Sequence, residues 1–130
     1  MSKYRRPLQF IFALMVVVTV WLVNPVVAGS GDPEAAKQAW PMIQNGVLVI
    51  DVRSEKEFAE GHLDGAINIE WDQTDALLAA IGSDKQRQVV LYCRSGNRSG
   101  KSITELESRG YTHLFNATGF EALQATKPAN

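Results

Sequence analysis

The side chains with the clearest chemistry lie in one short polar segment, CRSGNRSG, at residues 93–100. It holds Cys93, the only cysteine of the 130-residue sequence, and two arginines, Arg94 and Arg98. Because its two glycines free the backbone to curl, several N–H groups can point inward and form a site for an anion. The helix expected after the segment adds its positive end and its unpaired N–H groups. Each feature favours a charged sulfur, so the segment predicts that Cys93 is a thiolate near neutral pH.

Such a segment can activate a nucleophile and also bind an anionic substrate. The alternative is a structural cysteine, because a free cysteine often serves only as a small buried hydrophobic residue. The neighbouring glycines and arginines favour the reactive thiol. We predict Cys93 as the catalytic residue and the following residues as substrate-binding, namely Arg94, Ser95, Gly96, Asn97, Arg98 and Ser99. No metal site or cofactor is predicted, since the single cysteine and the two histidines, His62 and His113, are far apart in sequence.

The reactive segment follows an apolar run that predicts a strand, and similar runs occur elsewhere in the chain. The predicted strands are residues 47–52, 66–70, 88–93 and 111–117. The predicted helices are residues 34–40, 74–82 and 101–110, with a short helix before residue 61 and a last helical turn at 120–125. This alternation indicates an α/β domain with a mainly parallel central sheet and helices on both faces. In such sheets the active site lies at the carboxyl ends of the strands, which is where Cys93 stands.

Local signals set the boundaries of two of these helices. Ser54 and Glu57 form the capping-box pattern that opens the short helix. The first helix follows an Asp-Pro start at residues 32–33. We expect it to stop near Trp40, because Pro41 cannot continue a helix.

Residues 1–28 are predicted to be a signal peptide rather than part of the fold. A short cationic start precedes an apolar core at residues 10–23, and small residues lead up to Gly29. The alternative is an uncleaved membrane anchor, but the core is shorter than the roughly 20 residues that a spanning helix needs. Cleavage after Ala28 would leave residues 29–130 as one domain, periplasmic or otherwise exported. Only an uncleaved signal segment would then contact a membrane.

The charge of the chain argues against a nucleic-acid-binding protein. The formal net charge is −1, and the first 28 residues hold three of the 13 basic residues and no acidic one. Removing these three leaves 10 basic against 14 acidic residues, a net charge of −4. This excludes the basic surface that nucleic acids require.

In an exported protein, a cysteine without a partner in its own chain indicates an intermolecular bridge or a reactive thiol.

Residues 29–130 resemble a single-domain rhodanese, a member of the thiosulfate sulfurtransferase family. Besides the loop, VLVIDVR at residues 47–53 and FAEGHLDGA at residues 58–66 are similar to segments typical of that family. The chain departs from the family pattern at Thr118, where a glycine usually stands. The resemblance implies a rhodanese-like fold and transfer of sulfane sulfur from thiosulfate or a similar donor. The sulfur would be carried as a persulfide on Cys93 and passed to cyanide or a thiol.

The number of residues between the cysteine and the arginine of the loop distinguishes this family from other enzymes of similar fold. Dual-specificity phosphatases of the cell-cycle type and arsenate reductases have five residues between cysteine and arginine, whereas four separate Cys93 from Arg98. Arsenate reduction would also need a resolving thiol, and this sequence has no second cysteine. Mercaptopyruvate-using members tend to have glycine after the cysteine, and Arg94 resembles the thiosulfate type instead.

The expected partners are a small anionic sulfur donor and a thiol or cyanide acceptor, bound by a monomer. Two alternatives stay open: a sulfur carrier or redox partner that accepts persulfide from another protein, and a non-catalytic module that binds an anion. Arg94 would attract the donor, whereas Arg98 would brace the loop or hold the anion. Arg53 is expected to pair with a nearby glutamate, and the resemblance implies a structural His62 remote from the thiol.

Overall fold

The computed structural model describes residues 31–130, and the expected signal peptide lies outside these residues. The strands are β1 (Leu48–Asp51), β2 (Ile67–Asn68), β3 (Val89–Cys93) and β4 (Leu114–Gly119). The helices are α1 (Pro33–Gln44), α2 (Glu55–Glu60), α3 (Thr74–Ile81), α4 (Asn97–Ser108) and α5 (Phe120–Ala125). Among residues 31–130, no helix is long and apolar enough to cross a membrane.

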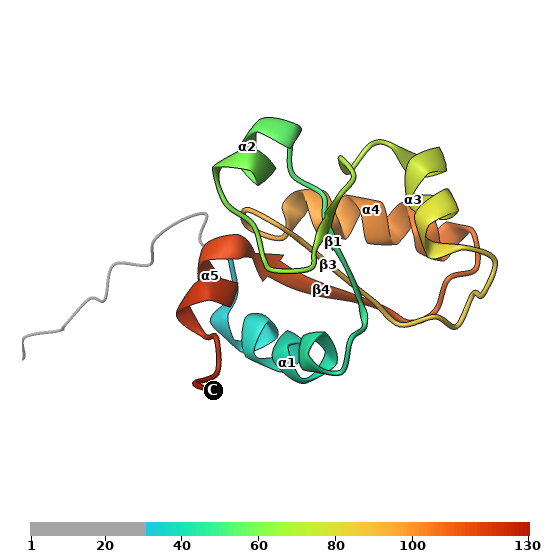
Figure 1. The fold of residues 1–130 in the computed structure, drawn as a ribbon. Coiled ribbons are helices and arrows are strands. Elements are labelled where there is room, and N and C mark those ends of the chain that lie inside the picture. Colours follow the sequence, from blue (N-terminus) through green and yellow to red (C-terminus); the bar gives the residue numbers. More distant parts are fainter. Residues whose placement is uncertain (1–30) are drawn as a thin grey trace, which may run out of the picture.

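The four strands form one parallel sheet in the order β2-β1-β3-β4. Every residue of the central strand β3 is buried, as its apolar sequence predicts for a parallel sheet covered on both sides. Helices α1 and α5 pack on one face, and α3 and α4 pack on the other (Figure 1). The predicted α/β architecture, with a parallel sheet and helices on both faces, is therefore confirmed.

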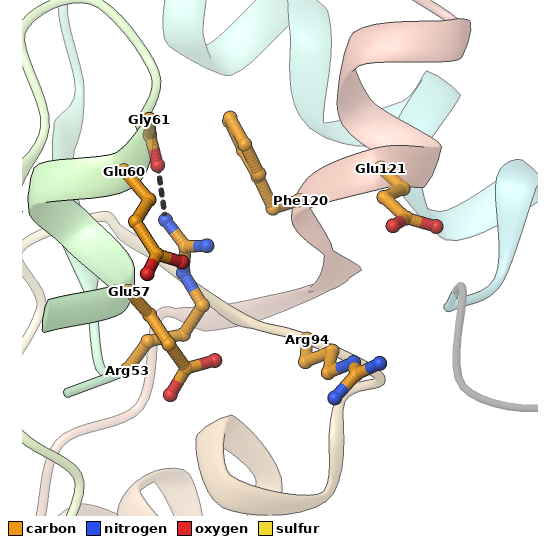
Figure 2. A pocket seen from close by; sticks show the side chains of 7 residues that line it. All are labelled: Arg53, Glu57, Glu60, Gly61, Arg94, Phe120 and Glu121. Atoms are coloured by element: carbon orange, nitrogen blue, oxygen red, sulfur yellow. Dashed lines mark hydrogen bonds between the residues drawn. The ribbon is translucent and has the colours of Figure 1, made fainter.

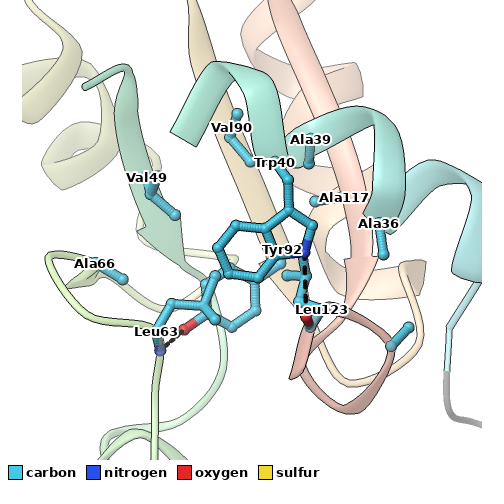
Figure 3. Close-up of a cluster of buried hydrophobic side chains, with 11 residues drawn as sticks. Ala36, Ala39, Trp40, Val49, Leu63, Ala66, Val90, Tyr92, Ala117 and Leu123 are labelled. Atoms are coloured by element: carbon cyan, nitrogen blue, oxygen red, sulfur yellow. Dashed lines mark hydrogen bonds between the residues drawn. The ribbon is translucent and has the colours of Figure 1, made fainter. Parts of the chain in front are cut away.

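Two large aromatic residues fix the face of the sheet that α1 and α5 cover (Figure 3). Trp40 on α1 donates its indole N–H to the carbonyl of Leu123 on α5 at 3.2 Å. Tyr92 on β3 accepts the N–H of Leu63, which follows α2, at 3.1 Å. Because both polar atoms are satisfied inside an apolar cluster, these bonds position α5 and the segment after α2 without a desolvation penalty.

The prediction that the first helix stops near Trp40 is wrong, because α1 runs to Gln44 with Pro41 inside it. Pro41 has no N–H to donate to the carbonyl of Lys37. Both residues are exposed, so water can bind that carbonyl instead. Trp40 and the half-buried Ile43 pack on the apolar cluster and hold the last turn in place.

The helix after the thiol begins earlier than predicted, at Asn97 rather than Lys101. Gly96 is its N-cap residue with φ 99°, a left-handed conformation that glycine adopts without strain. Gly100, expected in the loop, instead lies in the first turn of α4 and donates its N–H to the carbonyl of Gly96 at 2.9 Å. The connection between β3 and α4 is therefore only Arg94–Gly96, and the other predicted binding residues are helical.

Candidate active site

Cys93 is the last residue of β3, so its thiol stands at the carboxyl edge of the sheet beside the start of α4. The residue is 1% exposed. The N–H of Gly96 points at its sulfur with an N···S distance of 3.0 Å, and the Oγ atom of Ser99 lies 3.5 Å from it. The sulfur is therefore enclosed by the short connection and by the first turn of the helix that follows.

These contacts change the acidity of the thiol. Burial raises the pKa of Cys93, because a charged sulfur is harder to solvate inside the protein. The hydroxyl of Ser99, when its proton turns to a charged sulfur, and the backbone N–H groups of Ser99, Ser95 and Gly96 lower it by donating hydrogen bonds. Together the hydrogen bonds outweigh burial, and the net pKa lies below the usual thiol value. The environment thus favours an anionic sulfur, the form that acts as a nucleophile.

Arg98 is held by a carboxylate on another helix. Its two terminal nitrogens donate to the two carboxylate oxygens of Glu57 on α2, at 2.7 and 3.0 Å. Glu57 is also the third residue of α2 and forms the predicted capping box with Ser54. The hydrogen bonds from Arg98, together with those from Ser54, lower the pKa of Glu57 to about 2. Of the two roles left open for Arg98, its contacts support bracing the first turn of α4 against α2.

Arg53 forms a buried ion pair, but its partner is not the expected glutamate. Its Nη2 atom lies 2.6 Å from Oδ2 of Asp51 and 2.7 Å from the carbonyl of Gly61. The guanidinium also lies over the ring of Phe120, 4.5 Å from its centroid. Arg53 thus joins the end of β1 to the end of α2 and to α5, and its charge is already compensated.

A pocket of about 350 Å³ lies next to the thiol loop (Figure 2). Its lining residues are Arg53, Glu57, Glu60, Gly61, Arg94, Phe120 and Glu121. Arg94 comes from the loop, across from Glu57 and Glu60 of α2 and on the same side of the view as Glu121 of α5 (Figure 2). Within residues 31–130 Arg94 has no ion-pair partner, whereas Arg53 and Glu57 are both paired. The pocket therefore combines Arg94, which has no ion-pair partner among the described residues, with the exposed carboxylates of Glu60 and Glu121.

The pocket does not gather all the predicted site residues. Only Arg94 belongs to its lining, whereas Cys93 and residues 95–99 do not. The backbone amides and Ser99 surround the sulfur, and Arg94 faces the neighbouring pocket. The structure thus divides the predicted residues into an inner group at the sulfur and one cation at an entrance.

Two residues at the end of β4 contact the loop, and sequence reasoning did not select them as site residues. Asn116 donates its side-chain N–H to the carbonyl of Gly96 at 3.0 Å, and its Oδ1 atom lies 2.7 Å from Oγ of Ser99. Thr118 has φ 67°, and its side chain would lie 3.1 Å from a Cβ atom added at Gly96. The departure from the family pattern at Thr118 was the only available signal, and Asn116 had none.

The histidines lie apart from the thiol. His62 is exposed, stacks on Phe58 with 3.6 Å between ring centroids and bonds through Nδ1 to the carbonyl of Phe58. His113 is exposed and contacts Thr112. Over residues 31–130 no group of side chains has the composition and proximity of a metal site.

The fold and the site define a class: an α/β domain with an enclosed thiol between a central parallel strand and the helix that follows. The sequence model of the family described as rhodanese-like domain matches residues 35–126. The chain therefore belongs to the rhodanese-like family. The predicted family and its fold are therefore confirmed.

Known relatives and solved structures agree with this assignment. Thiosulfate sulfurtransferase PspE of Escherichia coli (strain K12) is 36% identical over 60% of this chain and 75% of its own length. Thiosulfate sulfurtransferase GlpE of Pseudomonas aeruginosa (strain LESB58) is 29% identical over 74% of this chain and 86% of its own. A structure described as rhodanese with anions from E. coli is 35% identical with a TM-score of 0.52, over 57% of this chain and 88% of that one. The Alr3790 protein of Anabaena sp., at 22% identity and a TM-score of 0.58 over 76% of this chain and 79% of that one, shares the fold.

Proposed function

We propose that the protein is a sulfurtransferase that moves sulfane sulfur from thiosulfate, or a similar donor, to cyanide or a thiol through Cys93. The observation that carries this proposal is the set of hydrogen bonds at the buried sulfur, with the N–H of Gly96 at 3.0 Å. These donors stabilise negative charge on sulfur, both in the thiolate and in a persulfide. The names of the relatives PspE and GlpE support thiosulfate as the donor.

The reaction is a double displacement. The Cys93 thiolate attacks the outer sulfur of thiosulfate, the sulfur–sulfur bond of the donor breaks, and sulfite leaves with the bonding electron pair. Cys93 then carries an anionic persulfide. Cyanide attacks the outer sulfur of that persulfide, thiocyanate leaves, and the thiolate is restored. Since the sequence has no second cysteine, the acceptor must come from outside the chain.

Arg94 recruits the donor in this scheme. It is the one uncompensated cation among the residues that line the pocket beside the loop. A positive charge at an entrance raises the local concentration of an anion such as thiosulfate. Cys93 itself is only 1% exposed, so the donor would reach the sulfur through a narrow approach.

The test is production of thiocyanate from thiosulfate and cyanide by the purified protein, compared with Cys93→Ser. We expect turnover by the wild type and only background by the serine variant. Thiocyanate formation by Cys93→Ser at the wild-type rate would show that the mechanism is wrong. A persulfide that can be trapped without turnover would indicate the sulfur carrier, and neither product would indicate the anion-binding module.

The proposal includes an exported protein whose signal peptide is residues 1–28. Its support is the cationic start and the apolar core at residues 10–23. The mass of the protein purified from cells would test it, since cleavage after Ala28 predicts a chain that begins at Gly29. Retention of the full mass in the membrane fraction would indicate an anchor instead.

A further inference from the structure

Ser99 stands between the thiol and β4 and is fully buried. Its Oγ atom lies 3.5 Å from Sγ of Cys93 and 2.7 Å from Oδ1 of Asn116. A hydroxyl carries one proton and cannot donate it to both atoms at once. The atom that receives this proton therefore decides whether the hydroxyl stabilises or opposes a negative sulfur.

The orientation of the Asn116 carboxamide is set by two backbone groups. Its Oδ1 atom accepts the N–H of Thr118 at 3.0 Å, and its Nδ2 atom donates to the carbonyl of Gly96 at 3.0 Å. If the amide were flipped, its NH₂ group would face the N–H of Thr118 and its oxygen would face the carbonyl of Gly96, so both hydrogen bonds would be lost. The atom that faces Ser99 is therefore an acceptor, and at 2.7 Å the hydroxyl of Ser99 donates to Asn116.

With its proton on this bond, Ser99 turns a lone pair toward the sulfur. That arrangement suits a protonated thiol, whose S–H can donate to the hydroxyl oxygen, and disfavours a thiolate. When the thiol releases its proton to water, the hydroxyl can turn its own proton to the sulfur, because a bond to a charged acceptor is stronger. Oδ1 of Asn116 then keeps the N–H of Thr118, so the carboxamide oxygen is not left without a donor.

We propose that Asn116 is a positioning residue that sets the reactivity of Cys93 by competing with the sulfur for the Ser99 hydroxyl proton. The same carboxamide holds the carbonyl of Gly96, whose N–H lies against the sulfur. Asn116 thus contacts two residues that donate to the thiolate. The effect of Asn116 on sulfur transfer rests on the proposed function of Cys93. Its effect on the reactivity of the thiol does not, because that reactivity is measurable without a sulfur donor.

The charged side chains near Cys93, Ser99 and Asn116 do not take part in the competition for the hydroxyl proton. Arg98 of α4 is paired with Glu57, Asp51 of β1 is paired with Arg53, and β4 has no charged residue. The other charged residues of the loop, α1 and α4 are exposed: Arg94, Glu34, Lys37, Lys101, Glu105 and Glu107. Within the described residues, no hydrogen bond joins a charged side chain to Ser99 or Asn116. The competition is therefore between neutral groups around one ionisable sulfur.

A double-mutant experiment tests the competition through the rate at which iodoacetamide, a neutral reagent, alkylates the thiolate as pH is varied. In the wild-type background, Ser99→Ala removes a donor to the charged sulfur and should slow alkylation at pH 6 by about tenfold. In the Asn116→Asp background, the carboxylate holds the hydroxyl proton, and the same Ser99→Ala change should slow alkylation by less than about twofold. Equal slowing in both backgrounds would overturn the proposal.

A measurement on the wild-type protein covers the case in which Asn116→Asp does not fold. The side-chain amide NMR signals of Asn116 should shift with pH at the same midpoint as the alkylation rate of Cys93. Asn68 is the matched control, because its Nδ2 atom donates to the carbonyls of Asp51 and Arg53 and does not contact the loop. A constant Asn116 signal through the thiol titration would overturn the proposal. Neither experiment uses thiosulfate, so an error in the proposed sulfur transfer would leave both results unchanged.

Discussion

Arg94 and Arg98 carry the same side chain near the same sulfur, but their surroundings give them different tasks. Both terminal nitrogens of Arg98 donate hydrogen bonds to the carboxylate of Glu57. Arg94 is exposed, lines the pocket and makes no ion pair among the described residues. A paired guanidinium is a structural clamp, whereas a free one at an entrance is available to an incoming anion. The structure thus distinguishes the surroundings of the two arginines, which supports the proposed division of their roles.

This separation predicts the kinetics of an Arg94 variant. Arg94→Ala should raise the KM for thiosulfate by about three- to tenfold with a smaller change in kcat, because it removes attraction and not the nucleophile. Glu121→Gln should lower that KM, since it removes a carboxylate from the same pocket. Arg109→Ala, at the other end of α4, is the matched control. Unchanged KM values over a range of salt concentrations in both pocket variants would contradict the assignment.

Helix α1 contains a proline that opposes helix formation, and the packing of the helix outweighs this effect. Pro41 costs the helix a hydrogen bond, but the helix continues because Trp40 and Ile43 pack on the apolar cluster. Pro41→Ala should therefore raise the free energy of unfolding by about 1–2 kcal/mol, the helical gain less the added freedom of the unfolded chain. Urea unfolding measures this difference. Pro33→Ala is the control and should not stabilise, because proline fits the first helical position.

The alternation of apolar runs and helical patterns is enough to predict the parallel sheet and the place of Cys93 at a strand end. The capping box of Ser54 and Glu57 is equally local, and both of its hydrogen bonds form. The hydrogen bond that Arg98 donates to Glu57 joins residues 41 positions apart and depends on how α2 packs beside α4. No short pattern contains that information.

The same limit explains why Asn116 could not be selected from sequence. It reaches Ser99 only because β4 lies next to β3 and α4 packs on both strands. An asparagine in an apolar strand carries no sign of its partner until the strand order is known. Thr118 gave a weak sign as a departure from glycine, and its φ of 67° lies in the left-handed region that favours glycine.

Glu57 links the stability of the entire fold to pH. The carboxylate caps α2 and pairs with Arg98 of α4, so it connects two helices on either side of the candidate active site. Hydrogen bonds from Arg98, and further ones from Ser54, lower its pKa from the usual 4.5 to about 2 in the folded protein. Because the folded pKa is depressed, this contribution is fully present above about pH 4.5 and is lost as pH falls toward 2.

Glu57→Gln should therefore be less stable than the wild type at pH 7, by about 1 kcal/mol, since a pair with 28% and 31% exposed side chains is partly screened by solvent. The difference should shrink as pH falls from 5 to 2, where the wild-type carboxylate takes up its proton. Urea unfolding at several pH values measures it, and added salt should reduce it at pH 7. Glu105→Gln, which removes a more exposed pair with Arg109 on the surface of α4, is the matched control and should change stability less. A difference for Glu57→Gln that stays constant down to pH 2 would show that the clamp between α2 and α4 does not depend on the charge of Glu57.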